Sequence, residues 1–207
     1  MTRMKIYVDY NLLERLVDAL EGATLKTAGN DWAEDHGVLP RIWESFLSKK
    51  ISLITCEADC LAEFINVKPC VIKSYSEVKK HLSGKMLRKF EIFEKLEKGP
   101  LKIGPYGDYG WGMVPWGGGE EQHLELLKEI RRVLQRPSPE EPQKDRDARH
   151  LMHSAVYGCR FFLTMDYRLI HNFQSPSAKF KQFMETHKFS LAPIRPARFL
   201  NELNSLL

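Results

Sequence analysis

Apolar residues recur along the chain with two different spacings, and these spacings predict strands that alternate with helices. Short apolar runs at 4–8, 51–55 and 160–165 have the length of buried strands. Between these runs, apolar side chains return every three or four residues, which is typical of amphipathic helices. The first helix shows the pattern most clearly, and Asn11 is a residue type that caps helices there. Its apolar positions are Leu12, Leu13, Leu16, Val17 and Leu20.

The same spacings predict helices around 42–47, 60–65, 76–98, 120–134, 145–158, 177–187 and 196–206, and a short strand at 189–192. Gly158 is a suitable helix stop. The polar stretch 28–37, the Pro-rich stretch 135–143 and the Gly- and aromatic-rich stretch 99–119 are predicted to be irregular. Strands alternating with helices indicate an α/β domain with a mainly parallel sheet and helices on both sides. We expect one domain over 1–207, with 99–119 as an insertion.

Composition narrows the class of protein only modestly. The chain has 207 residues, of which 43% are hydrophobic, and this suits one domain with an ordinary core. No apolar run approaches the roughly 18 residues of a membrane span, and no secretory signal is visible. The four cysteines show no disulfide framework, so we expect a cytoplasmic protein. A formal charge of +4 is compatible with a polyanionic partner.

Two of the predicted strands are followed by an acid, and this pattern predicts a metal site. Asp9 ends the first strand and Asp166 ends the strand at 160–165. Sites in parallel sheets lie at the carboxyl ends of the strands, where these acids would meet. Asp147 or Asp145 could join them from the start of a helix. Clustered carboxylates repel one another unless a cation intervenes, and hard oxygen ligands suit Mg²⁺ or Mn²⁺.

Other interpretations of the same residues stay open at this point. Asp9 and Asp166 could simply cap the helices that follow them. His150 and His153, with Cys56 or Cys60, could form a zinc site, although no paired Cys-x-x-Cys motif is present. Aromatic residues within 104–119 could stack on unpaired bases or fold back on the domain. Basic side chains on the predicted helices could contact phosphates or be merely solvated. These are Lys79, Lys80, Lys85, Arg88, Lys89, Arg131, Arg132 and Arg136.

Three segments of the chain resemble the PIN-domain nucleases. "YVDYN" (7–11) looks like the first strand of that family with its Asp-x-Asn ending. "DARHLMHSAVYGCRFFLTMD" (147–166) is similar to its helix-Gly-strand-Thr-x-Asp block. "FSLAPIRPARFLNEL" (189–203) is similar to its closing strand, proline and helix. The resemblance implies a three-layer α/β/α fold around a mainly parallel sheet.

The resemblance also implies an activity and a set of site residues. Asp9, Asp147 and Asp166 would coordinate Mg²⁺ or Mn²⁺, and Asn11 and Thr164 would be supporting polar groups. The second acid of the family is a Glu on the helix after the second strand, which Glu63 in "LAEF" matches best, with Glu57 as its rival. The expected reaction is hydrolysis of RNA by a metal-activated water, leaving a 3′-hydroxyl and a 5′-phosphate.

The chain departs from the compact members of this family through the stretch 99–119 and an added helix. A simple assignment as the toxin of a toxin–antitoxin pair is therefore in doubt. The alternative to a nuclease is a PIN-like module with weak or no catalysis that binds nucleic acid or a protein. The expected partner is single-stranded or structured RNA, while an antitoxin, another protein or a second copy of the chain stay open.

Overall fold

The computed structural model describes residues 3–22, 30–66, 74–99, 120–134 and 146–206. Within these ranges the strands form one parallel sheet, in the order β3-β2-β1-β4-β5. The strands are β1 (Met4–Val8), β2 (Ile51–Thr55), β3 (Glu97–Lys98), β4 (Phe161–Leu163) and β5 (Pro193–Ile194). Because β1 lies in the middle, residues that follow β1 meet residues that follow β2 and β4 at one edge of the sheet.

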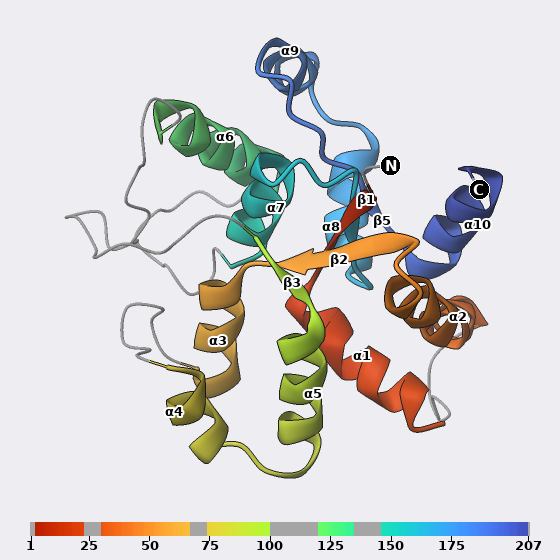
Figure 1. Cartoon of the computed structure of the whole chain (residues 1–207). Helices are drawn as coiled ribbons and strands as arrows, with labels where there is room; N and C mark the ends of the chain where they lie inside the picture. The colour runs from red at the N-terminus through yellow and green to blue at the C-terminus, as the bar shows by residue number, and fades with distance from the viewer. Residues whose placement is uncertain (1–2, 23–29, 67–73, 100–119, 135–145, 207) are drawn as a thin grey trace.

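Helices cover both faces of the sheet, because neighbouring strand residues point into different cores (Figure 1). Ile6 and Val8 pack into one core, while Tyr7 between them packs into the other. The first core is covered by α1 (Tyr10–Leu20), α2 (Asn30–Leu47), α3 (Glu57–Ile65), α4 (Tyr75–Lys80), α5 (Gly84–Lys95) and α10 (Pro196–Leu206). The second is covered by α6 (Glu120–Val133), α7 (Arg146–Val156), α8 (Tyr167–Gln174) and α9 (Ala178–Thr186). The predicted α/β class with a parallel sheet is confirmed.

The helix α2 corrects the prediction that 28–37 is irregular. The helix begins at Asn30, and its polar residue Asp35 is fully buried. The Asp35 carboxylate accepts hydrogen bonds from the Ala197 backbone N–H at 3.0 Å and from the Tyr167 hydroxyl at 3.0 Å, and it pairs with the Arg195 guanidinium at 2.8 Å. Because these three partners satisfy the Asp35 carboxylate, the acid can be buried on the inner side of the helix α2. The polar pattern looked like a loop because these partners lie far along the chain.

Several boundaries also differ from the prediction. The N-cap of α1 is Asp9 rather than Asn11. The region 76–98 is divided into α4, α5 and the two-residue strand β3, and β5 lies at 193–194 rather than 189–192. Gly158 has a φ of +67°, and it follows the end of α7 as expected. The stretches 100–119 and 135–143, and with them most of the predicted insertion, lie outside the described residues.

None of the helices in the described ranges combines the length and the apolar character needed to cross a membrane.

Candidate functional site

Asp9 lies directly after β1, where two hydrogen bonds fix it against β4. Its backbone N–H donates to the Leu163 carbonyl at 3.1 Å. The fully buried Thr164 hydroxyl donates to Asp9 Oδ2 at 2.6 Å. The side chain of Asp9 is itself buried, with 5% of the residue exposed. A carboxylate in this position is costly unless other groups compensate its charge.

Thr164 also connects Asp9 to Asp166. The Asp166 backbone N–H donates to Thr164 Oγ1 at 3.0 Å, so one hydroxyl bridges the ends of β1 and β4. Asp166 Oδ1 accepts from the backbone N–H groups of Arg168 and Leu169, at 2.9 and 3.1 Å, and so caps α8. The structure therefore places the two predicted acids at the same edge of the sheet, and the helix-cap interpretation of Asp166 is also confirmed.

The charges of Asp147 and Glu63 act on Asp9 as well. Burial is the main reason that the pKa of Asp9 rises from 3.8 to about 6, and the nearby carboxylates of Asp147 and Glu63 raise it further. The charge of His150 and the hydrogen bond from Thr164 act in the opposite direction. Acids from β1, α3 and α7 thus gather in one place, while Asp145 lies outside the described residues.

Glu63, rather than its rival Glu57, faces this cluster. The Glu63 side chain is 11% exposed, and its Oε1 lies 2.8 Å from His150 Nε2 on α7. Glu57 instead hydrogen-bonds the Tyr75 hydroxyl on α4, and this bond, after burial, raises the pKa of that hydroxyl. Asn11 is exposed in the first turn of α1, where it lines the same cleft as Asp166.

A chain of buried groups holds His150 in place behind Glu63. The Cys56 backbone N–H donates to Tyr7 Oη at 3.1 Å, and Tyr7 Oη lies 2.6 Å from His150 Nδ1. Burial lowers the pKa of His150, but Glu63, Asp59 and Asp9 outweigh burial and raise it to about 9. The two ring nitrogens of His150 are thus both engaged, Nδ1 with Tyr7 and Nε2 with Glu63. The sequence pattern indicated His150 as a possible zinc ligand, and it contained no signal for Tyr7.

A second polar cluster lies one turn earlier on α3, and the sequence analysis missed most of it. Asp59 Oδ1 is 3.1 Å from Arg149 Nε, and Asp59 Oδ2 is 3.0 Å from His153 Nε2. Burial alone would raise the pKa of Asp59, but Arg149 and His153 outweigh it and hold the pKa well below its usual range. Cys56 lies near enough to Asp59 and His153 for the three to offer donors to one ion.

The structure changes the predicted zinc site. Cys56 and His153 do come together, but the fourth candidate, Cys60, has its Sγ 2.9 Å from Thr55 Oγ1, and His150 is committed to Glu63. The carboxylate of Asp59 already has two basic partners. The geometry therefore favours an internally balanced ion-pair cluster over a zinc site.

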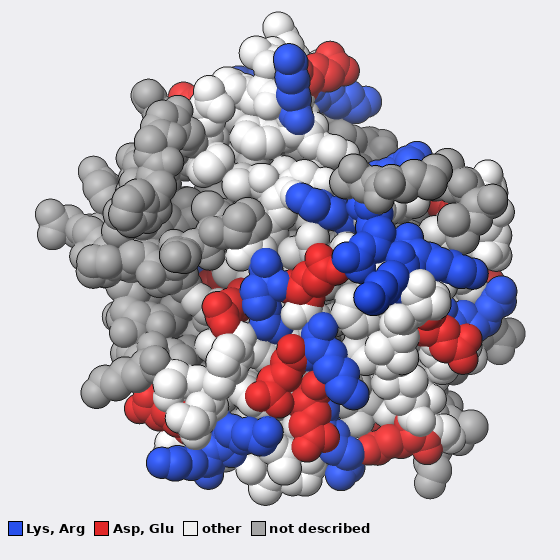
Figure 2. Space-filling view, in the orientation of Figure 1, with Lys and Arg blue, Asp and Glu red and all other residues white. Residues whose placement is uncertain are grey.

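Half of the eight basic side chains singled out in the sequence are engaged with acids. Lys79, Lys85, Arg88 and Arg132 form ion pairs with acids on described elements. Lys89 is buried, with its Nζ 3.4 Å from the centroid of the Tyr10 ring. Figure 2 shows Lys and Arg side chains gathered most densely over the start of β2 and over α2 and α10. That region is at the amino end of β2, so it does not coincide with the acids at the carboxyl ends.

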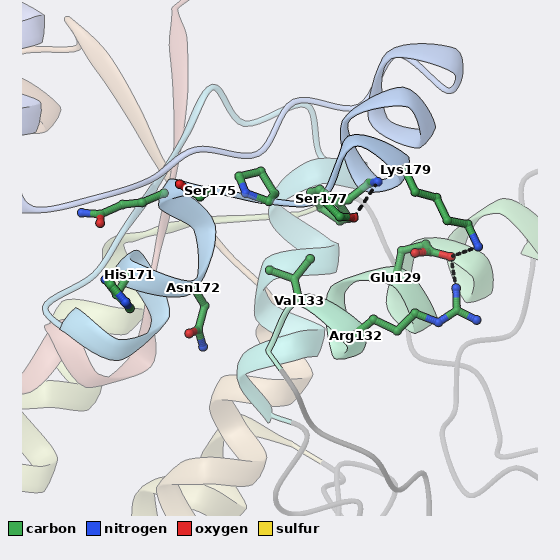
Figure 3. Close-up of a pocket in the computed structure, with 11 residues that line it drawn as sticks. Glu129, Arg132, Val133, His171, Asn172, Ser175, Ser177 and Lys179 are labelled. Atoms are coloured by element: carbon green, nitrogen blue, oxygen red, sulfur yellow. Dashed lines mark hydrogen bonds and ion pairs between the residues drawn. The ribbon is translucent and has the colours of Figure 1, made fainter.

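Described residues line each of two clefts in the protein. One, of about 540 Å³, lies between α6, α8 and α9 (Figure 3). Its basic side chains Arg132 and Lys179 both pair with Glu129. The other, of about 460 Å³, lies between α1, the start of α2 and the start of α8, and Asp166 and Asn11 are in its wall. The second cleft therefore adjoins the acid cluster.

Comparisons of this chain with models of protein families, with curated proteins and with solved structures give no match.

Proposed function

We propose that this protein is a metal-dependent nuclease of the PIN type that hydrolyses phosphodiester bonds in RNA. The observation that carries the proposal is the gathering of three further acids, each from a different part of the chain, around Asp9. Asp166 is joined to it through Thr164, and Glu63 and Asp147 act on it through their charges. These are the acids that the resemblance to PIN-domain nucleases implies, and the parallel sheet with helices on both faces is compatible with that family.

The donor set fits a hard divalent cation. All four side chains offer carboxylate oxygens, which Mg²⁺ and Mn²⁺ prefer. Burial is the main cause of the raised pKa of Asp9, and the carboxylates of Asp147 and Glu63 add to it, so a bound cation would compensate a charge that is costly there. We therefore assign Asp9, Glu63, Asp147 and Asp166 to hold one or two Mg²⁺ or Mn²⁺ ions, with Thr164 orienting Asp9.

The residues of the chain have distinct tasks in this mechanism. A bound divalent cation supplies a Lewis acid beside the phosphate and favours attack by water at neutral pH. Thr164 holds Asp9 Oδ2 and the backbone of Asp166 in a fixed relation, so the two carboxylates keep their spacing. His150 donates to Glu63 and so fixes the orientation of its carboxylate. No protein nucleophile is required.

The test is cleavage of labelled single-stranded RNA in the presence of Mn²⁺. We expect Asp9→Asn and Asp166→Asn each to lower the rate by about 10²- to 10³-fold, as loss of one preorganised electrostatic group does. Asp18→Asn is the matched control. Asp18 is an acid on α1, the helix that begins after Asp9, and it pairs with Lys85 at the surface.

Metal-dependent cleavage that survives both substitutions would refute this site. Binding of RNA with no cleavage of any substrate would instead favour the non-catalytic module. Products that lack a 5′-phosphate would contradict the expected direction of bond cleavage.

A further inference from the structure

The cleft beside Asp166 combines groups that suit a single-stranded nucleotide. It is lined by Asn11, Glu14, Arg15, Trp32, Met165, Asp166, Tyr167 and Arg168. Two guanidinium groups, two aromatic rings and one acid of the proposed metal site therefore share a space of about 460 Å³. This volume lies within the range of small-molecule sites in proteins.

The two arginines of the cleft, Arg15 and Arg168, are not engaged in ion pairs with described acids. The neighbouring acid Glu14 is engaged with Lys85 at 3.0 Å. Guanidinium groups bind phosphate oxygens in a bidentate manner, so these two side chains are suited to grip a phosphate on each side of the cleft.

Two aromatic rings pack against each other in the same cleft, at an inclined angle. The ring centroids of Trp32 and Tyr167 are 4.9 Å apart, with an angle of 53° between the planes. The Tyr167 hydroxyl donates to the buried Asp35 at 3.0 Å, and the Arg195 guanidinium lies 4.7 Å from the Tyr167 centroid. Tyr167 is thus held at its hydroxyl and on its ring. Aromatic rings held in this way stack on bases with little loss of side-chain freedom.

We propose that this cleft is a subsite for one unpaired nucleotide next to the bond that is cleaved. Its base stacks on Trp32, which packs on the anchored Tyr167 ring, and its flanking phosphates contact Arg15 and Arg168. The inference rests on the proposed function, since Asp166 joins the subsite to the acid cluster. A base in a duplex has both of its faces covered by neighbouring bases, so the subsite selects single strands.

The direct test measures RNA binding in the presence of EDTA, which chelates divalent cations and so prevents the proposed cleavage. The probe is a fluorescein-labelled oligouridylate of about ten nucleotides, with binding followed by fluorescence anisotropy. Trp32→Leu should weaken binding roughly fivefold to 150-fold, which is the range for loss of one stacked base. Trp32→Phe keeps an aromatic face and should restore most of the affinity. Thermal melts of the three proteins exclude an effect of folding.

Salt dependence tests the arginines separately. Arg15→Gln and Arg168→Gln should each reduce the slope of log affinity against log salt by about 0.7, which is the value for one phosphate contact on a single strand. Lys181→Gln is the control, because it removes the same charge from an exposed position on α9 outside both clefts.

The outcomes distinguish this subsite from the nuclease itself. Variant effects on binding in EDTA, together with no cleavage in Mn²⁺, would retain the subsite and reject the nuclease. Cleavage with unchanged affinity in Trp32→Leu, or with unchanged salt slopes in both arginine variants, would reject the subsite alone. Equal affinity for a duplex of the same length would reject the selection of single strands.

Discussion

The helices α3 and α7 meet through two polar clusters that lie one helical turn apart and have opposite charge balance. In the first, the single acid Asp59 pairs with the two basic groups Arg149 and His153. In the second, His150 is the partner of Glu63, and further acids act on Asp9 beside it. The pKa of Asp59 is held below its usual range, whereas that of Asp9 is raised to about 6.

The difference indicates a division of tasks between the two clusters. A buried acid with two basic partners has its charge compensated, and here it links the two helices. The acids around Asp9 exceed their basic partners, so they retain the capacity to bind a cation. Because the balanced cluster holds α3 against α7, it also fixes the helices that carry Glu63 and Asp147.

The largest expected effect comes from breaking the balanced cluster. Asp59→Asn leaves Arg149 and His153 without their shared carboxylate in a buried position, and we expect a loss of about 3–5 kcal/mol in the free energy of unfolding. Asp9→Asn removes one of several repelling acids and should leave the stability unchanged or raise it. Urea unfolding of both variants measures the contrast. Equal destabilisation by the two substitutions would show that the clusters do not differ.

The pH dependence of stability should separate the clusters next. The pKa of Asp9 is about 6 in the folded state, against 3.8 for the ordinary group, so the folded protein binds more protons in this interval. The contribution of Asp9 to the free energy of unfolding is therefore highest below about pH 4 and falls as the pH rises to about 6. The loss amounts to about 3 kcal/mol, which follows from the size of the pKa change.

The measurement is urea unfolding from pH 4 to pH 7.5, with the wild type compared against Asp9→Asn at each pH. The difference between the two proteins should shift by about 2–3 kcal/mol in favour of the variant over this range. A difference that does not vary with pH would contradict the raised pKa. The contribution of Asp59 to stability depends on pH with the opposite sign. Because its pKa is lowered, Asp59 stabilises the folded protein at neutral pH, and this contribution is lost only as the pH falls into strong acid.

A third contrast is the response to Mn²⁺. A ligand that binds only the folded protein stabilises it by about 2.7 kcal/mol at one hundred times its dissociation constant. For a chain of this length, that corresponds to a rise of roughly 5–10 °C in the unfolding temperature. We expect the rise in the wild type above pH 6 and its loss in Asp9→Asn. A rise that persists in Asp9→Asn would place the ion elsewhere, with the Cys56 cluster as the next candidate.

The two clusters also differ in how far the sequence predicted them. Asp9 and Asp166 could be found because each directly follows an apolar run, and parallel strands bring such positions to one edge. Glu63 came only from a resemblance, since the sequence does not say which side of α3 faces Asp9. The interactions of Asp59 could not be found at all. Its partners lie about ninety residues away on α7. Arg and His side chains on a predicted helix are usually expected to face solvent, so they did not indicate a buried cluster.

The same limit explains the error at α2 and the interpretation of the basic helices. Asp35 is polar in sequence but buried in space, because its partners are at 167, 195 and 197. Lys89 is charged in sequence but is covered by the Tyr10 ring. Local sequence patterns predict helices and strands well where the buried side chains are apolar and recur with the period of the helix or strand. They fail where a charged side chain is buried by partners that are distant in the chain.

The smallest predicted effect tests whether His150 positions Glu63 rather than merely filling space. His150→Ala removes the donor to Glu63 and should weaken Mn²⁺ binding by about 10- to 100-fold, as loss of a group that orients a metal ligand does. His150→Gln retains an N–H donor and should recover part of this affinity. Mn²⁺ titrations followed by electron paramagnetic resonance measure the dissociation constants directly, without requiring turnover.

The matched control for His150 is His153→Gln, because His153 belongs to the balanced cluster on the same helix. This variant should lower the stability while changing the Mn²⁺ dissociation constant of the folded protein clearly less than His150→Ala does, since its partner Asp59 is assigned no ion. Tyr7→Phe removes the group behind His150 and should weaken Mn²⁺ binding by about fivefold, the equivalent of one ordinary hydrogen bond. If His150→Ala and His153→Gln changed Mn²⁺ affinity equally, the effect would come from the packing of α3 on α7, and the orientation of Glu63 would not depend on His150.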